Sequence, residues 1–246
     1  MSQHVVSEIY IKNFEGGYFG MVEYYVTIGN IKEKSENGDK IYYVVNNGKE
    51  HYLSIYETIM WCTLHWNILT EKELESDFGR ALHKQRIFDD VSFKQVLCRL
   101  MQRGLIQKGT NYIAADAVYS LAQDLLLKPI GFVNSFKRLM AFLCLYVQGT
   151  PLEACVRYLR KPALTELEQK IMRFSKRFKV STAELIKIAE GNLWNVQTEE
   201  ELVEKVYGRE LYADTIGNSA CFDGVKYEIL TAVVSLYLKK QAVFEH

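Results

Sequence analysis

The sequence predicts an α+β protein in which helices dominate, and two observations support this class. Aromatic and β-branched residues crowd the first fifty or so positions, as in EYYVTIGNIK and KIYYVV, which is typical of strands. From Ser54 onward, helix start signals recur along the chain. A hydrophobic content of 48% and a charged content of 24% indicate a folded chain, and 246 residues suffice for a sizeable core.

The N-terminal segment, residues 1–53, is predicted to form antiparallel β hairpins that pack on the unit that follows. Two or three strands are expected between residues 8 and 53. Asn46-Asn47-Gly48 separates the last two strand-like runs, and Asn-Gly is a strong hairpin signal. A second turn is expected at residues 35–39, SENGD.

Helix starts are marked by capping boxes, in which Ser or Thr at the N-cap is followed three residues later by Glu or Gln. The matches are Ser54/Glu57, Thr70/Glu73, Ser92/Gln95, Thr150/Glu153, Thr165/Glu168, Ser181/Glu184 and Thr198/Glu201. In the C-terminal half they predict helices over 132–148, 151–160, 165–178, 182–190, 198–207 and 223–241.

Residues 54–128 are predicted to form three helices followed by a β-hairpin. The first helix would place Ile55, Ile59, Cys62 and Trp66 on its apolar face. The second begins at Thr70, and the third begins at Ser92 and ends at Gly104. A short strand, a turn at residues 108–111 and a return strand from Tyr112 would then complete a winged helix-turn-helix. LCRLMQRGLIQKG, residues 97–109, resembles the third helix and wing of MarR- and PadR-type winged-helix regulators.

The resemblance and the third helix together imply contact with double-stranded DNA. With Phe93, Val96, Leu97 and Leu100 toward the core, the opposite face presents Gln95, Arg99 and Gln102, flanked by Lys94 and Arg103. Arg pairs bidentately with guanine and Gln with adenine in the major groove. Lys84, Arg86 and the wing residue Lys108 are expected to reach phosphates.

The C-terminal part, residues 129–246, is predicted to be a helical domain beyond the Pro129–Gly131 break. Within it, FSKRFKVSTAELIKIAEG, residues 174–191, resembles a phage-repressor-type helix-turn-helix. This resemblance implies a second DNA contact through Lys176, Arg177, Thr182 and Lys187, with Ala183 on the same face. The last helix, apolar along Val225, Ile229, Val233 and Leu236, would close the core or form a dimer interface.

Charge is distributed unevenly along a chain whose thirty basic and thirty acidic residues cancel. The neutral total excludes a protein that coats nucleic acid through bulk charge. Residues 78–110, however, carry seven basic residues against two acidic ones, and residues 157–187 carry nine against three. Two locally basic regions are therefore expected.

A second interpretation uses many of the same residues. The N-terminal strands followed by three helices also resemble PqqD-like peptide-recognition domains, in which an extended peptide adds to a sheet edge. This resemblance implies a groove lined by Tyr42, Tyr43, Val44 and Tyr52, with Lys94 and Arg99 facing an acidic peptide. A replication-initiator-like DNA-binding protein is a third alternative.

Enzymes and metal proteins find no support in the sequence. GxGxxG, GxxxxGK[ST], HExxH and GxSxG motifs do not occur, so neither catalytic residues nor a cofactor are expected. The five cysteines form no CxxC pair, which argues against zinc and predicts buried, reduced thiols. Without a signal peptide or a membrane-spanning run, the chain is expected to be cytoplasmic. The sequence therefore predicts a sequence-specific DNA-binding protein, most simply a transcriptional regulator, which two-fold half-site recognition would make a homodimer.

Overall fold

The computed structural model describes residues 20–36, 39–87, 91–130, 162–208 and 224–246, and it confirms the predicted α+β, mainly α class. The strands are β1 (Val22–Thr27), β2 (Asn30–Glu36), β3 (Asp39–Asn46), β4 (Lys49–Tyr52), β5 (Ile106–Asn111), β6 (Leu126–Pro129) and β7 (Ala242–Glu245). The helices are α2 (Ile55–Leu64), α3 (Glu71–Lys84), α4 (Phe93–Gln102), α5 (Ala114–Ala122), α8 (Glu166–Arg177), α9 (Thr182–Glu190), α10 (Glu199–Tyr207) and α12 (Gly224–Leu238).

Capping boxes start four of these helices as predicted. At α2, α3, α8 and α9 the N-cap hydroxyl accepts from the backbone N–H three residues on, and the Glu there accepts from the N-cap N–H. At α10 only the first of these two hydrogen bonds is formed: the Thr198 hydroxyl accepts from the backbone N–H of Glu201. Ser92 makes no side-chain cap hydrogen bond at α4. The expected helices at 132–148 and 151–160, and the box at Thr150, lie outside the described residues.

Three small antiparallel sheets organise the chain. β2, β3 and β4 form two hairpins, the second closed by Asn47 and Gly48 at φ of 46° and 76°, as the Asn-Gly signal predicted. β1 pairs with β5, and β6 pairs with β7 at the end of the chain. Residues 8–19, which were expected to contribute to the first strands, lie outside the described part.

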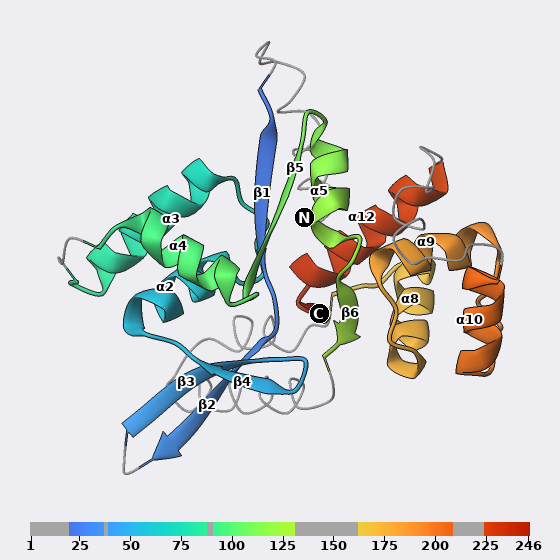
Figure 1. Cartoon of the computed structure of the whole chain (residues 1–246), viewed down its shortest axis with the longest axis horizontal. Coiled ribbons are helices and arrows are strands. Elements are labelled where there is room, and N and C mark those ends of the chain that lie inside the picture. Colours follow the sequence, from blue (N-terminus) through green and yellow to red (C-terminus); the bar gives the residue numbers. More distant parts are fainter. Residues whose placement is uncertain (1–19, 37–38, 88–90, 131–161, 209–223) are drawn as a thin grey trace, which may run out of the picture.

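The β1–β5 pair lies between two hydrophobic cores. Tyr25 of β1 and Ile106 of β5 join a core with α2, α3 and α4, whereas Tyr24, Val26 and Ile28 join a core with α5, α8, α9 and α12. Successive side chains of a strand point to opposite sides, which explains why β1 serves both cores. Figure 1 shows α2–α4 on one side of this layer and the remaining helices on the other. Because α5 packs with the later helices, the second core includes residues on both sides of the expected boundary at residue 128.

The first helix buries a different face from the one predicted. In α2 the buried side chains are Glu57, Met60, Trp61 and Leu64. Of the four residues predicted for the apolar face, Ile55 is 60% exposed and Cys62 is also exposed, whereas Ile59 and Trp66 are half-buried and pack against the cores. The buried set follows the i, i+3, i+4, i+7 pattern equally well, so periodicity alone did not decide which stripe faces the core.

Candidate nucleic-acid interface

Helix α4 exposes the polar face that the sequence predicted. Its buried residues are Phe93, Val96, Leu97 and Leu100, as expected from the pattern. Its exposed residues are Lys94, Gln95, Cys98, Arg99 and Gln102. Neither Lys94 nor Arg99 makes an ion pair with a carboxylate of the described residues, so both cationic groups are available to a ligand.

The end of α3 adds two cations beside the connection to α4. Lys84 is the last residue of α3 and Arg86 follows it, and both are exposed. The rings of Phe78 and Phe93, 6.1 Å apart, hold the two helices together. Lys84 and Arg86 thus remain compatible with the predicted phosphate contacts.

Arg103 has a structural role that the DNA assignment did not anticipate. Its Nη1 lies 3.0 Å from Glu57 Oε1 of α2, and its Nη2 donates to the carbonyl of Tyr52 at 2.6 Å. Burial raises the pKa of the Glu57 carboxyl, but hydrogen bonds from Ser54 and Arg103 outweigh this effect and lower the pKa below its ordinary value. Because the guanidinium ties α4 to α2 and β4, Arg103 is a poor candidate for a base contact.

The predicted wing is not formed from residues 105–113. β5 pairs with β1, which precedes the three helices, and residues 114–122 form α5 in place of a return strand. On its other edge, β1 forms an isolated antiparallel bridge through Tyr25 to Leu69, which lies in the α2–α3 connection. The three helices are therefore backed by a sheet whose second strand comes from the N-terminal side. Strand pairing is non-local, so the local helix-ending signal at Gly104 could not show which strand pairs with β5.

Lys108 therefore lies within a strand and not in a turn. The register partner of Lys108 on β1 is Tyr25. The Nζ of Lys108 reaches along that strand to Glu23 and lies 2.7 Å from Glu23 Oε1. The hydrogen bond from Lys108 lowers the pKa of Glu23, against a smaller opposing effect of burial. The Lys108 ammonium, predicted to contact phosphate, is thus engaged by a carboxylate across the two strands.

Gly109, predicted as a turn residue, instead permits the close approach of α5. A Cβ built on Gly109 would lie 2.2 Å from the Ala117 carbonyl oxygen and 2.4 Å from Leu121 Cβ. The first of these neighbours is backbone and cannot move aside. Only glycine therefore fits at this point of β5.

The second predicted helix-turn-helix has the right helices but not the predicted contact face. α8 and α9 are joined by four residues, and the exposed Lys176 and Arg177 lie at the end of α8. Thr182 and Ala183, however, are 0% and 5% exposed. Lys187 is half-buried and pairs with Glu190 at 3.5 Å. The first turn of α9 packs into the core, because α9 contributes Leu185, Ile186 and Ile188 as well, so neither Thr182 nor Ala183 can reach DNA.

The peptide-groove residues do not share a surface. In the β2–β3–β4 sheet, Tyr43 and Tyr52 are register partners with ring centroids 5.7 Å apart. Val44 points to the opposite face and is fully buried, and Tyr42 alternates with Tyr43 in the same way. The expected lining is therefore split between the two faces of the sheet.

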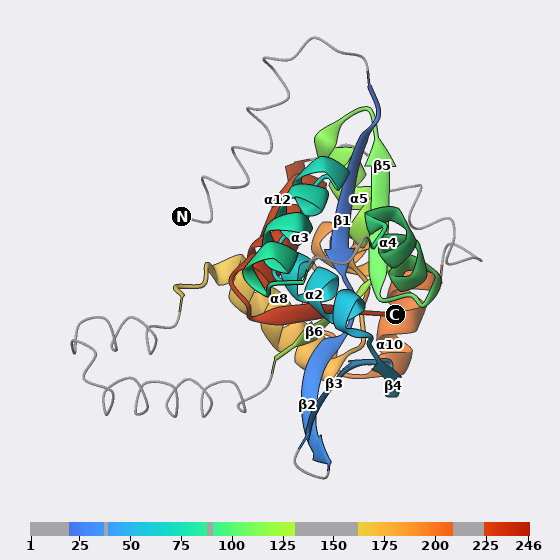
Figure 2. The same ribbon diagram turned by 90° about the vertical axis from the view of Figure 1, so that its left-hand side faces the viewer.

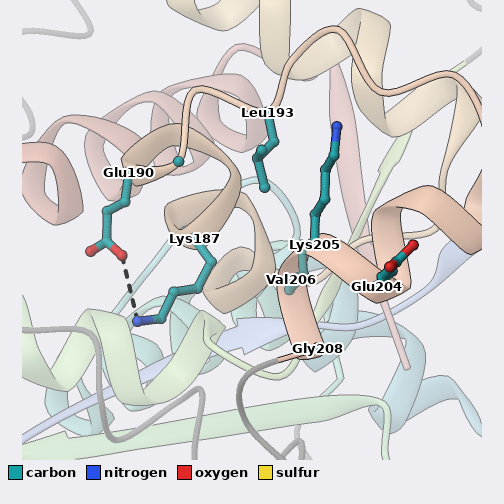
Figure 3. A pocket seen from close by; sticks show the side chains of 8 residues that line it. Lys187, Glu190, Leu193, Glu204, Lys205, Val206 and Gly208 are labelled. Carbon is teal, nitrogen blue, oxygen red and sulfur yellow. Dashed lines mark ion pairs between the residues drawn. The ribbon is translucent and has the colours of Figure 1, made fainter.

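An open pocket of about 760 Å³ lies between the end of α9 and α10. Figure 3 shows its lining, with Lys187 and Glu190 paired on one side and Lys205 and Glu204 on the other. Leu193 and Val206 supply the apolar part. Each side of the pocket carries one lysine and one glutamate, so the charges of the lining favour no single class of ligand.

The described residues contain no candidate metal site. No group of three or more His, Cys, Asp or Glu side chains is placed to hold a metal ion there. Cys62 and Cys98, the two described cysteines, are free thiols but exposed, contrary to the buried thiols predicted. Among the described helices, none combines the length and apolar character that crossing a bilayer requires.

Comparison with known proteins adds no relative: no family model, no curated protein and no solved structure matches the chain.

Proposed function

We propose that the protein binds double-stranded DNA in a sequence-specific manner and that α4 reads the bases. The observation that carries this proposal is the exposed face of α4. Lys94, Gln95 and Arg99 are exposed there, together with Gln102, while the opposite face is fixed in the core with α2 and α3. A polar helix face held rigidly on a small domain is the element that enters the major groove in helix-turn-helix proteins.

The groups on this face match base edges. Arg99 supplies a bidentate donor for guanine, and Gln95 and Gln102 supply the donor and acceptor pair that adenine accepts. Lys84 and Arg86 would contact phosphates, which sets position without reading sequence. A role in transcription is the simplest use of such a surface, and a role in replication initiation would use it in the same way.

Peptide binding at the sheet is the second candidate, because β4 is an outer strand and the Glu50–Tyr52 segment is mostly exposed. An added strand would pair with the outward backbone groups of β4. Arg103, however, already donates to the Tyr52 carbonyl on that edge. This contact would have to break, which favours DNA over peptide as the ligand.

The test is retention of a genomic fragment pool by the full chain at low and moderate salt. Arg99→Ala should relax the preference at one base position and weaken binding to the preferred site by about 1–3 kcal/mol. Lys84→Ala should weaken binding evenly across fragments and reduce the salt dependence by about one ion. Lys205→Ala, on the far helix α10, serves as the matched control and should change neither.

Failure has a clear form. If the wild-type protein enriches no fragment at low salt, or if Arg99→Ala enriches the same fragments as the wild type with the same affinity, α4 is not a base-reading helix. Capture of an acidic peptide that Arg103→Ala preserves or strengthens, by freeing the Tyr52 carbonyl, would then favour the sheet edge.

A further inference from the structure

Helix α8 carries a dense row of cations on its solvent face. Ile171 and Phe174 are buried and fix its orientation. The exposed basic residues are Lys170, Arg173, Lys176 and Arg177, followed by Lys179 just beyond the helix. Of the two carboxylates in α8, Glu168 is buried, and Glu166 is exposed in the first turn, one turn before Lys170 on the same side of the helix, but makes no ion pair with the row among the described residues.

These cations are not neutralised by carboxylates of the described chain. Arg177 Nη2 donates to the carbonyl and to Oε1 of Gln197, and Arg173 Nη2 donates to Gln169. By contrast, Lys128, Lys187, Lys205 and Lys239 all lie within 4 Å of a carboxylate. The row on α8 therefore concentrates positive charge and keeps its arginines bound only to neutral acceptors.

The dimensions of the row suit a phosphate backbone. From Lys170 to Arg177 the helix rises about 10 Å, at about 1.5 Å per residue. Phosphates of one DNA strand recur about every 3.4 Å along the axis, so the row covers about three of them.

The α8 face and the α4 face lie on opposite sides of the β1–β5 layer. The buried residues of α4 pack into the core that contains Tyr25, and those of α8 into the core that contains Tyr24 and Val26. In each helix the exposed side is the one turned away from its own core. Figure 2, viewed from the side of α2, α3 and α4, shows α8 and α10 behind that layer.

We propose that the exposed face of α8 binds the phosphate backbone of a second duplex segment, so that one chain bridges two segments of DNA. The proposal rests on the proposed function for the first segment, which α4 holds. It replaces the first turn of α9 as the second contact, because Thr182 and Ala183 are buried. Because α4 and α8 pack into different cores on the two sides of the β1–β5 layer, a separate duplex segment is assigned to each helix.

The test is a capture assay with the full chain. An immobilised duplex carrying a fragment enriched by the wild-type protein is loaded with protein, and a second, fluorescent duplex is added in solution. Arg173→Glu/Lys176→Glu should bind the immobilised duplex with unchanged affinity but capture at least about tenfold less of the second duplex. In this variant, capture of the second duplex should also depend less steeply on salt concentration, by about two released ions. Lys49→Glu/Lys205→Glu, with two exposed lysines outside both faces, is the matched control and should capture as the wild type does.

The two proposals fail in different ways. Unchanged capture by Arg173→Glu/Lys176→Glu overturns bridging through α8, and it would also be the result if two α4 helices of a dimer did the bridging. If Arg173→Glu/Lys176→Glu binds phosphatidylserine vesicles less well than the wild type but captures the second duplex equally well, the α8 face is assigned to membranes. That result likewise overturns the proposal. If Lys94→Glu/Arg99→Glu leaves binding of the immobilised duplex intact, the proposed function of α4 fails while the α8 result stands by itself.

Discussion

Acid sensitivity of the fold is expected to arise from His65, which lies where the two cores meet. Its Nδ1 is 3.1 Å from Thr27 Oγ1, and its ring stacks on Trp61 with centroids 4.3 Å apart. Thr27 Oγ1 is in turn 2.8 Å from the hydroxyl of Tyr237 on α12. Burial, and to a smaller extent the charge of Lys240, lowers the pKa of His65 from 6.5 to about 3.

The sign of the effect follows from proton linkage. Between pH 6.5 and about 3 the unfolded chain binds a proton at His65 and the folded chain does not, so the free energy of unfolding falls as the pH falls. The full slope is about 1.4 kcal/mol per pH unit. From pH 6.5 to pH 5 this amounts to about 2 kcal/mol at most, and partial solvent access to the ring reduces it toward about 1 kcal/mol.

Urea unfolding at pH 7 and pH 5 measures this difference. We expect the wild type to lose about 1–2 kcal/mol between the two pH values and His65→Gln, which cannot titrate, to lose less by about that amount. His51→Asn is the matched control, because burial lowers the pKa of His51 as well but that ring lies on the exposed sheet and should contribute less. If His65→Gln is as acid-sensitive as the wild type, His65 is not excluded from protonation in the fold and the reasoning fails.

Three further predictions concern stability and can be checked by urea unfolding at pH 7. Tyr237→Phe should destabilise the fold by about 2–3 kcal/mol, because the buried hydroxyl satisfies two partners; a loss below about 0.5 kcal/mol would contradict this. Gly109→Ala should cost more than about 2 kcal/mol, whereas Gly79→Ala, with open space around it in α3, should gain up to about 1 kcal/mol; equal effects would refute the close approach of α5. Lys239→Ala should cost about 3–5 kcal/mol, because it leaves Glu168 charged and 2% exposed, and Glu168→Gln in addition should recover part of that loss.

Local signals in the sequence determined where helices begin and which side of α4 is apolar. A capping box such as Ser54/Glu57 involves neighbouring residues only, so its geometry is encoded within one turn. The face of α4 was likewise predictable, because four apolar residues at helical spacing leave one solution. These two features carry the proposed DNA contact by Gln95, Arg99 and Gln102.

Only the tertiary structure decided which of the predicted cations remain available. Arg103 and Lys108 look like their neighbours in the sequence, but each meets a carboxylate from a distant segment, Glu57 or Glu23. The partner of β5 was equally hidden, since strand pairing joins residues about eighty positions apart and leaves no local trace. The placement of the two basic helices on different cores was also decided by the tertiary structure, because the alternating side chains of β1 serve one core with α4 and another with α8.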